Sequence, residues 1–336
     1  MQALGNQFVI LDTGRSGIRS DIQKIQSLAS IMLDLGFDQI ITIFNSSEAN
    51  VYMSIANRDG SEAFACGNGA CCVAWLLMKE TGRTHVSIQT RTGILQASHS
   101  DLNYRTSHDA GDLITIDMGE PRLLWHEIPL SKDTNTIAVP IQTVGLPGSA
   151  LLNVKDPNAI EPPSVWPLSA TMANMGTTSA AGLPNASMVN AETTSAAGLP
   201  NASMVNMGNP HAVFFVTNLE SYDLKAMGPE LERHPIFPER ANISIAEVID
   251  AETVKVKVWE RGVGLTQACG TAACAVLVSG VRLGKIDRKI RVIMPGGSLF
   301  VEWKQGDNHV MMSSSVTFEF AGLLNPDTLS WKPGCL

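Results

Sequence analysis

The feature that most constrains this 336-residue chain is a cysteine motif that occurs twice, 203 positions apart (269 − 66). FACGNGACCVA surrounds Cys66 and QACGTAACAVL surrounds Cys269, so both segments read Ala-Cys-Gly-x-x-Ala-Cys. Three further matches keep the same offset and pair Asn6 with Asn209, Gln39 with Asn242, and Asn57 with Glu260. A constant offset over four places indicates two halves of similar structure.

Each half has the pattern of strands, then a helix that begins just after the cysteine, then a hairpin. The alternation of apolar and polar residues at 51–57 and 254–260 is typical of strands. Glycines at 82 and 284 predict where the two helices end. We therefore expect an α+β fold of two pseudo-symmetric domains that face each other across a cleft. Each domain should be a mostly antiparallel curled sheet around a central helix.

One segment interrupts this order. The sequence TTSAAGLPNASMVN occurs at 177–190 and again at 193–206, a tandem copy with a period of 16 residues (193 − 177). Two copies are too few for a solenoid, and residues such as Ala, Ser, Gly and Asn bury little apolar surface. We therefore interpret about 170–206 as a low-complexity insertion at the surface of the second domain.

The composition excludes several classes of partner. The formal net charge is −8 and no long Lys or Arg run occurs, so nucleic acid is not expected to bind. There is no stretch of about 18 apolar residues that could span a membrane, and MQALGNQFVILD does not resemble a signal peptide. We expect a cytoplasmic protein without a membrane partner, whose six cysteines are mostly free thiols.

The repeated cysteines point to chemistry because of where they lie. A thiol directly before a helix meets unpaired backbone N–H groups and the positive end of the helix dipole, which lower its pKa toward neutrality. Gly67 and Gly69 would let a ligand approach the backbone closely. A thiolate here could act as a base, a nucleophile or a metal ligand. Because both halves present the same group, the symmetry favours an acid and a base acting on opposite faces of one carbon atom.

Competing interpretations of the cysteines are weaker. Cys71 follows Cys66 by five positions, roughly 140° around a helix, so the two thiols do not face one zinc ion. No metal and no cofactor are therefore expected. Cys71, Cys72 and Cys274 fit buried core thiols, and a structural disulfide is disfavoured by the reducing compartment. Gly67-Asn68-Gly69 alone is a weak phosphate loop, and GxxxxGK[ST] is absent.

The motifs LGNQF, LGFDQ, NRDGSEAFACGNGA, MGNPH, FPERAN and ERGVGLTQACGTAACA occur in this order. In this set the chain closely resembles the diaminopimelate epimerase family, over nearly its whole length apart from roughly 121–206. The resemblance implies cofactor-independent interconversion of LL- and meso-diaminopimelate, on the lysine and peptidoglycan route, by a homodimer. It also implies that the C-terminal strand, for which 316–324 is the candidate, returns to the first half. The domains are then 1–120 plus 319–336, and 121–318.

The resemblance also implies roles for individual residues. Cys66 and Cys269 match the catalytic acid/base thiols, and His211 and Glu260 match positions that tune a thiol pKa. The positions that match substrate-binding groups are the amides Asn6, Gln39, Asn57, Asn209 and Asn242, the helix-start residues Gly67, Asn68, Gly270 and Thr271, and the pair Glu260 and Arg261. Amide side chains suit a substrate with two carboxylates and two ammonium groups, since they donate and accept.

Two alternatives remain open from the sequence. One is another isomerase of similar fold, such as a proline racemase or hydroxyproline epimerase, although those relatives usually carry GHG where this chain has GNG at 67–69. The other is a non-catalytic redox protein in which Cys66 and Cys269 form a reversible disulfide.

Overall fold

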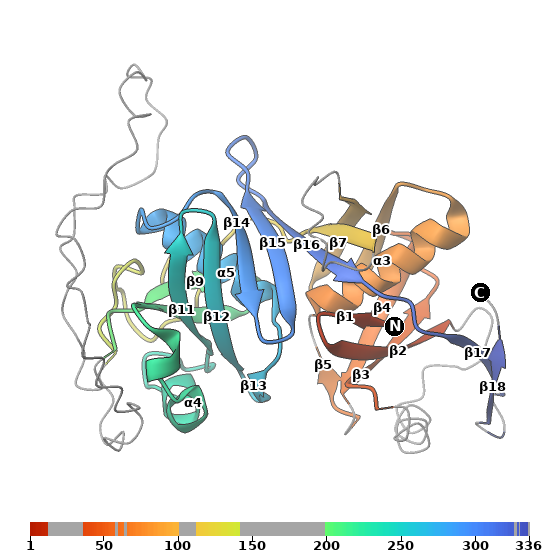
Figure 1. Ribbon diagram of the computed structural model, residues 1–336, viewed down its shortest axis with the longest axis horizontal. Helices are drawn as coiled ribbons and strands as arrows, with labels where there is room; N and C mark the ends of the chain where they lie inside the picture. The colour runs from red at the N-terminus through yellow and green to blue at the C-terminus, as the bar shows by residue number, and fades with distance from the viewer. Residues whose placement is uncertain are drawn as a thin grey trace.

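The protein consists of two similar halves that share one continuous sheet (Figure 1). The computed structural model describes residues 1–12, 36–57, 60–63, 66–100, 112–141, 199–325, 328 and 330–334. The first half contains β1 (Gln2–Ala3), β2 (Asn6–Asp12), β3 (Gln39–Phe44), β4 (Val51–Asn57), β5 (Glu62–Ala63), α3 (Gly67–Thr81), β6 (His85–Thr90), β7 (Gly93–His99) and β8 (Asp112–Asp117).

The second half repeats this order of strands, and two helices are described between its second and third strands, at a place where residues 13–35 of the first half lie outside the described residues. It contains β9 (Ser203–Asn206), β10 (Pro210–Val216), a short 3-10 helix η4 (Leu219–Ser221), α4 (Leu224–Glu232), β11 (Asn242–Asp250), β12 (Thr253–Glu260), β13 (Gly264–Thr266), α5 (Gly270–Arg282), β14 (Lys289–Met294), β15 (Gly297–Trp303) and β16 (Val310–Val316). A separate hairpin, β17 (Ala321–Leu324) with β18 (Trp331–Gly334), follows.

The strand pairing confirms the internal repeat residue by residue. In the first half Phe8 of β2 pairs with Gln39 of β3 in parallel, and in the second half His211 of β10 pairs with Asn242 of β11 in the same way. The offset of 203 also relates the pairs β3 with β4 and β11 with β12, and the pairs β4 with β5 and β12 with β13. The two sheets therefore have the same register as well as the same order.

A central helix fills each curled sheet. The first turn of α3 is buried and the helix ends at Gly82, whose left-handed φ of 68° suits glycine. In α5 every residue from Gly270 to Gly280 is buried, as expected for a helix that is apolar on all sides. Most neighbouring strands are antiparallel. The predicted α+β fold of two curled sheets around central helices is confirmed.

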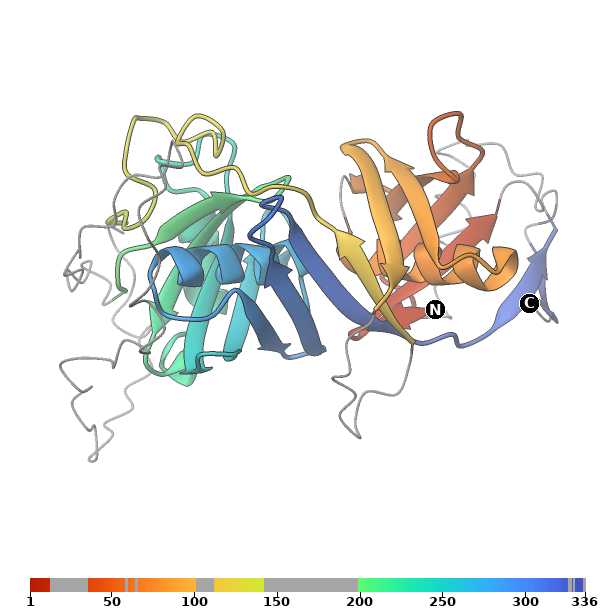
Figure 2. The same cartoon turned by 90° about the horizontal axis from the view of Figure 1, so that it is seen from above.

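The strand β16 joins the halves. It pairs with β15 of the second half on one side and with β8 of the first half on the other, both antiparallel. Figure 2 shows this strand running from one half to the other. The strand that crosses back is therefore 310–316, and the expectation that 316–324 would be that strand was wrong. In the hairpin beyond it, Leu324 and Trp331 pack against the first half, where they cover Leu11, Phe37 and Ile40.

The end of the duplicated segment is part of the core, which corrects its assignment as a surface insertion. Residues 199–206 are described, and 170–198 lie outside the described residues. Met204 in β9 is fully buried, and its carbonyl oxygen accepts a hydrogen bond from Arg282 at 3.1 Å. Arg282 also donates to Thr136 at 2.8 Å. The small residues around Met204 allow close strand packing, so the low complexity of the segment gave a misleading signal.

The burial of Met204 predicts a cost for removing its side chain. Replacing Met204 by Ala should lower the free energy of unfolding by about 2–5 kcal/mol, because the change leaves a cavity in the core. Leu124→Ala removes a side chain that is 56% exposed and is the control, which should change the free energy by less than about 0.5 kcal/mol. Urea unfolding of both variants measures this, and equal losses would contradict a core position for Met204.

Candidate active site

A cavity of about 490 Å³ lies between the halves and gathers residues from both. Eleven of the residues predicted from the sequence line it: Asn6, Gln39, Asn57, Cys66, Gly67, Asn68, Asn209, Glu260, Cys269, Gly270 and Thr271. The remaining lining residues are Asp38, Ser61, Gly262, Val263, Thr266 and Ala268. Asn242, Arg261 and His211 are not among the residues that line it.

The two thiols occupy equivalent places, because each cysteine is the N-cap residue of its central helix. The Sγ of Cys66 accepts a hydrogen bond from the backbone N–H of Gly69 at 3.3 Å. Burial raises the pKa of Cys66 to about 12, although the N–H groups of Gly69 and Asn68 act in the opposite direction. Helix-start stabilisation is therefore present and is smaller than the cost of desolvating a thiolate.

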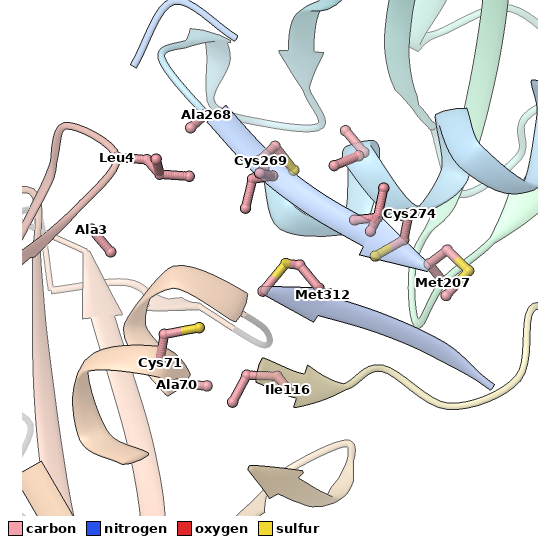
Figure 3. Close-up of a cluster of buried hydrophobic side chains, with 14 of the residues drawn as sticks. Ala3, Leu4, Ala70, Cys71, Ile116, Met207, Ala268, Cys269, Cys274 and Met312 are labelled. Carbon is pink, nitrogen blue, oxygen red and sulfur yellow. The ribbon is translucent and has the colours of Figure 1, made fainter. Parts of the chain in front are cut away.

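Cys269 has a carboxyl group beside it. Its Sγ lies 3.4 Å from the hydroxyl oxygen of Thr271, and it shares a hydrogen bond with the side chain of Glu260. Burial raises the pKa of Cys269 well above its usual range, and the charge of Glu260 raises it further. Figure 3 shows Cys269 at the start of α5. The predicted lowering of the thiol pKa values toward neutrality is wrong for both cysteines.

Glu260 is held in a defined orientation at the end of β12. The hydroxyl of Thr266 donates to Oε1 of Glu260 at 2.6 Å. Burial raises the pKa of this carboxyl group, and the hydrogen bonds from Thr266 and Cys269 partly offset the effect. Because Glu260 accepts from Cys269 and also raises the thiol pKa, it favours the protonated form of that thiol. The predicted role of Glu260 in tuning a thiol stays a prediction.

The amides of the first half form two hydrogen-bonded pairs along the cavity. Asn68 donates from Nδ2 to Oδ1 of Asn6 at 2.8 Å, and Gln39 donates from Nε2 to Oδ1 of Asn57 at 2.9 Å. Asn57 in turn donates to Ser61 at 3.0 Å. Asn68 is buried, and its Oδ1 accepts no hydrogen bond from a described residue. A buried carbonyl oxygen without a donor is costly, so this atom is suited to accept from a ligand N–H group.

His211 acts on Asn209. It is fully buried, and its Nε2 lies 2.8 Å from Oδ1 of Asn209, which lines the cavity. Burial, and then the positive charge of Arg261, lower the pKa of His211 to about 3. The ring is therefore neutral near pH 7, so that Nε2–H donates and fixes the orientation of the Asn209 amide. The predicted tuning of a thiol pKa stays a prediction, and a neutral ring supplies no positive charge for it.

Asn242 and Arg261 support the loop that carries Glu260. Asn242 donates from Nδ2 to the carbonyl oxygen of Pro210 at 3.0 Å and accepts from the backbone N–H of Arg261 at 2.9 Å. The guanidinium of Arg261 donates to the carbonyl oxygen of Glu239 at 3.0 Å. Both residues thus bind protein groups next to the cavity, where the resemblance had predicted contacts with the substrate.

Sequence reasoning missed Asp38, Ser61 and Thr266. Each lies one to four positions from a predicted residue, at the end of a strand or next to it. Ser61 and Thr266 belong to the short β5 and β13 regions, where the chain doubles back before each cysteine. The sequence did contain a signal for Ser61 and Thr266. They are polar residues between the end of a strand and the cysteine motif, and the segment that joins the two must lie beside the start of the helix.

Other sites in the described parts of the chain are less suited to chemistry. A second cavity of about 440 Å³ lies on the opposite face of the sheet, where Met311 and Ser313 point. Several of its polar groups pair with one another, as in the 2.7 Å contact of Thr115 with Ser313 and the ion pair of Lys289 with Glu302. Within the described residues no group of three or more His, Cys, Asp or Glu side chains could hold a metal ion.

The described cysteines are free thiols. Besides the two N-cap residues they are Cys71, Cys72 and Cys274, and all three of these are buried. No helix of the described chain is long and apolar enough to cross a membrane.

The rate of alkylation of Cys66 should follow its raised pKa. Since the thiolate fraction grows about tenfold per pH unit below the pKa, the rate with iodoacetamide should keep rising up to about pH 10. Mass spectrometry of the Cys66 peptide, in a Cys269→Ala background, measures the rate. A plateau below pH 9 would mean that the helix start outweighs burial.

The neutral state of His211 predicts a pH dependence of stability. Its pKa is about 6.5 in the unfolded chain and about 3 in the folded protein, so the unfolded state binds the extra proton first. Its contribution is complete above about pH 6.5 and is lost as the pH falls toward 3. His211→Gln should therefore lose less free energy of unfolding between pH 7 and pH 4 than the original protein. An equal loss in both would show that His211 is protonated when folded.

The family model for diaminopimelate epimerase matches residues 1–124 and 203–318. A diaminopimelate epimerase of Brucella melitensis biotype 1 is 39% identical over 342 aligned positions, which cover 99% of this chain and 91% of that protein.

Two solved structures share the fold at low identity. A PhzF-family phenazine biosynthesis protein of Bacillus anthracis is 15% identical, with a TM-score of 0.56 over 94% of this chain and 92% of that one. A hydroxyproline epimerase from Agrobacterium vitis is 11% identical, with a TM-score of 0.51 over 95% of this chain and 89% of that one. At such identities the likeness concerns the fold alone. From the family match and the full-length relative, the chain belongs to the diaminopimelate epimerase family, a family of isomerases.

Proposed function

We propose that the protein interconverts LL- and meso-diaminopimelate by moving a proton across one α-carbon between Cys66 and Cys269. The observation that carries the proposal is that both thiols are N-cap residues of symmetry-related helices and line one cavity. A carbon held between two such groups can lose a proton on one face and gain one on the other. The family and the 39% identical relative support the choice of substrate.

The proton balance follows from the symmetry. One cysteine begins as thiolate and takes the α-proton, so that the C–H bond breaks and its electron pair stays on carbon. The other begins as thiol and gives its proton to the opposite face of that carbon. The first sulfur is then protonated and the second is a thiolate, so the next turnover can run in the opposite direction. No oxidant or reductant is required.

The helix starts lower the energy of the carbanion. The first backbone N–H groups of α3 and α5, at Gly67, Asn68, Gly270 and Thr271, have no acceptor within their helices and border the cavity. They can bind the carboxylate next to the reacting carbon, where negative charge increases as the proton leaves. This assigns to these four residues the role that the family resemblance implied.

The raised thiol pKa values fit a weakly acidic substrate. A thiolate with a high pKa is a stronger base toward a C–H bond than one that ionises near neutral pH. The cost of forming it in a buried site is reduced when the substrate brings an ammonium group close to the sulfur. The cavity also contains the carboxylates of Asp38 and Glu260, which favour a ligand with ammonium groups.

Selection of a substrate with two zwitterionic ends follows from the mixture of groups. Oδ1 of Asn68 can accept from an N–H group, while the amide N–H groups of Asn6, Asn57 and Asn209 can donate to carboxylates. Arg261 would complete a bidentate carboxylate contact if its guanidinium left the carbonyl oxygen of Glu239. A proline or hydroxyproline substrate has one such end and would leave part of this set unpaired.

Incubation with LL-diaminopimelate in deuterated water tests the proposal. The meso isomer should form, with deuterium at one α-carbon. Cys66→Ala and Cys269→Ala should each lower the inversion rate by at least about 10³-fold, because each removes an acid or base. Cys274→Ala, which alters a buried thiol of the core, is the matched control and should retain activity.

The outcomes of this experiment separate the alternatives. Inversion of trans-4-hydroxyproline or proline in place of diaminopimelate would favour the related isomerases. If Cys269→Ala kept both deuterium exchange and inversion, the two-thiol mechanism would be contradicted. If no amino acid reacted under reducing conditions, and a disulfide joined Cys66 to Cys269 under mild oxidation, the redox interpretation would replace the epimerase.

The setting of the reaction is part of the proposal. The proposed role is to supply meso-diaminopimelate for lysine and peptidoglycan precursors, and we therefore expect the reaction to take place in the cytoplasm. A homodimer is expected from the family, and light scattering at micromolar concentration distinguishes it from a monomer.

A further inference from the structure

Met312 lies at the centre of the strand that joins the halves. It pairs with Val301 of β15 on one side and with Ile116 of β8 on the other. Its side chain is fully buried and points toward the central helices (Figure 3). The neighbouring Met311 points to the opposite face of the sheet, where it borders the second cavity. Met312 therefore belongs to a strand that is paired with both halves at once.

The thioether of Met312 lies against the first residue of both helices. A Cβ atom added to Gly270 would be 2.5 Å from Sδ of Met312, and one added to Gly67 would be 2.8 Å from its Cε. The glycines also face each other, because a Cβ on Gly67 would be 3.9 Å from Cα of Gly270. The two helix starts and the methionine thus form one close-packed contact without room for a further atom.

The glycines of this contact are the residues that directly follow the two cysteines. Gly67 follows Cys66 and Gly270 follows Cys269, so the contact fixes the separation of the two backbones from which the thiols project. The thioether of Met312 lies against both glycines, so the helix starts cannot approach it further without displacing it. They cannot spread without leaving a gap around Met312, and a gap in a packed core is costly.

We propose that Met312 is a positioning residue that sets the distance between Cys66 and Cys269. The inference rests on the proposed two-thiol inversion and adds the element that determines its geometry. Both sulfurs must lie close to the same carbon atom, and a misplacement of about 1 Å in such an arrangement lowers the rate about 10²-fold. In this interpretation Gly67 and Gly270 are required because the methionine occupies the space of a Cβ. The alternative is that they are required only for approach of the ligand.

A pair of substitutions distinguishes these two reasons. Gly270→Ala should lower kcat for inversion by about 10²-fold, because the new Cβ displaces Met312 and the adjacent helix start. Adding Met312→Ala removes the displaced thioether, so Gly270→Ala/Met312→Ala should recover at least about tenfold of that loss. A double variant no more active than Gly270→Ala would overturn the proposal, since ligand approach alone would then explain the glycine.

A second measurement detects altered spacing directly. In Met312→Ala one thiol can still remove the α-proton and return a deuteron to the same face, whereas inversion needs both thiols. The ratio of deuterium exchange with retention to inversion should therefore rise by about tenfold. A purely structural loss of folded protein lowers both rates equally, and an unchanged ratio would overturn the proposal. Met311→Ala is the matched control and should keep the original ratio.

A conservative variant keeps the test valid if Met312→Ala does not fold. Met312→Leu preserves most of the volume and lacks the terminal methyl group that meets Gly67, so it should fold and show a smaller rise in the same ratio. An unchanged ratio in folded Met312→Leu together with an unfolded Met312→Ala would count against a positioning role. Failure of the original protein to invert any amino acid would instead refute the proposed function, so the two failures are distinguishable.

Discussion

The antiparallel pairing of β8 with β16 is the interaction on which the rest of the structure depends. It joins two sheets of the same register so that they are related by an approximate twofold rotation. A rotation of this kind brings equivalent points of the halves to opposite sides of one space. Because each central helix begins at the same point of its half, both cysteines are placed at the same cavity. The duplication alone would give two similar domains, and the strand pairing turns them into one site.

Burial and helix position compete at each thiol. The N-cap position offers backbone N–H groups to a thiolate, and that is the physical reason for expecting an easily ionised cysteine. The cavity walls instead remove water from both sulfurs, and the loss of hydration dominates. Local sequence determines the first effect, while the second depends on how the two halves close around the site. The spacing of the motif therefore pointed to the two sulfurs as candidates and could not give their acidity.

The predictable parts of the fold were those that depend on short-range pattern. Alternation identified β4 and β12, and the shared offset gave the correspondence of Gln39 with Asn242 and Asn57 with Glu260. The errors arose where long-range pairing decides. The residues around Met204 look like a polar loop, yet Arg282 and the neighbouring strand bury them. Likewise, the strand that crosses between the halves lies earlier in the sequence than expected, because residues 310–316 pair with both β8 and β15.

Equivalent positions have kept their backbone geometry and diverged in their side chains. Gln39 and Asn57 bond to each other at the cavity, whereas their counterparts Asn242 and Glu260 support a loop and accept from Cys269. The proposed chemistry requires equivalence only at the two sulfurs and at the helix starts that would hold the carboxylate. Away from them the site would treat the two ends of the substrate differently, since one end would react and the other would only be bound. The halves can therefore specialise wherever they contact the distal end, and the glycine pair beside Met312 is where they remain alike.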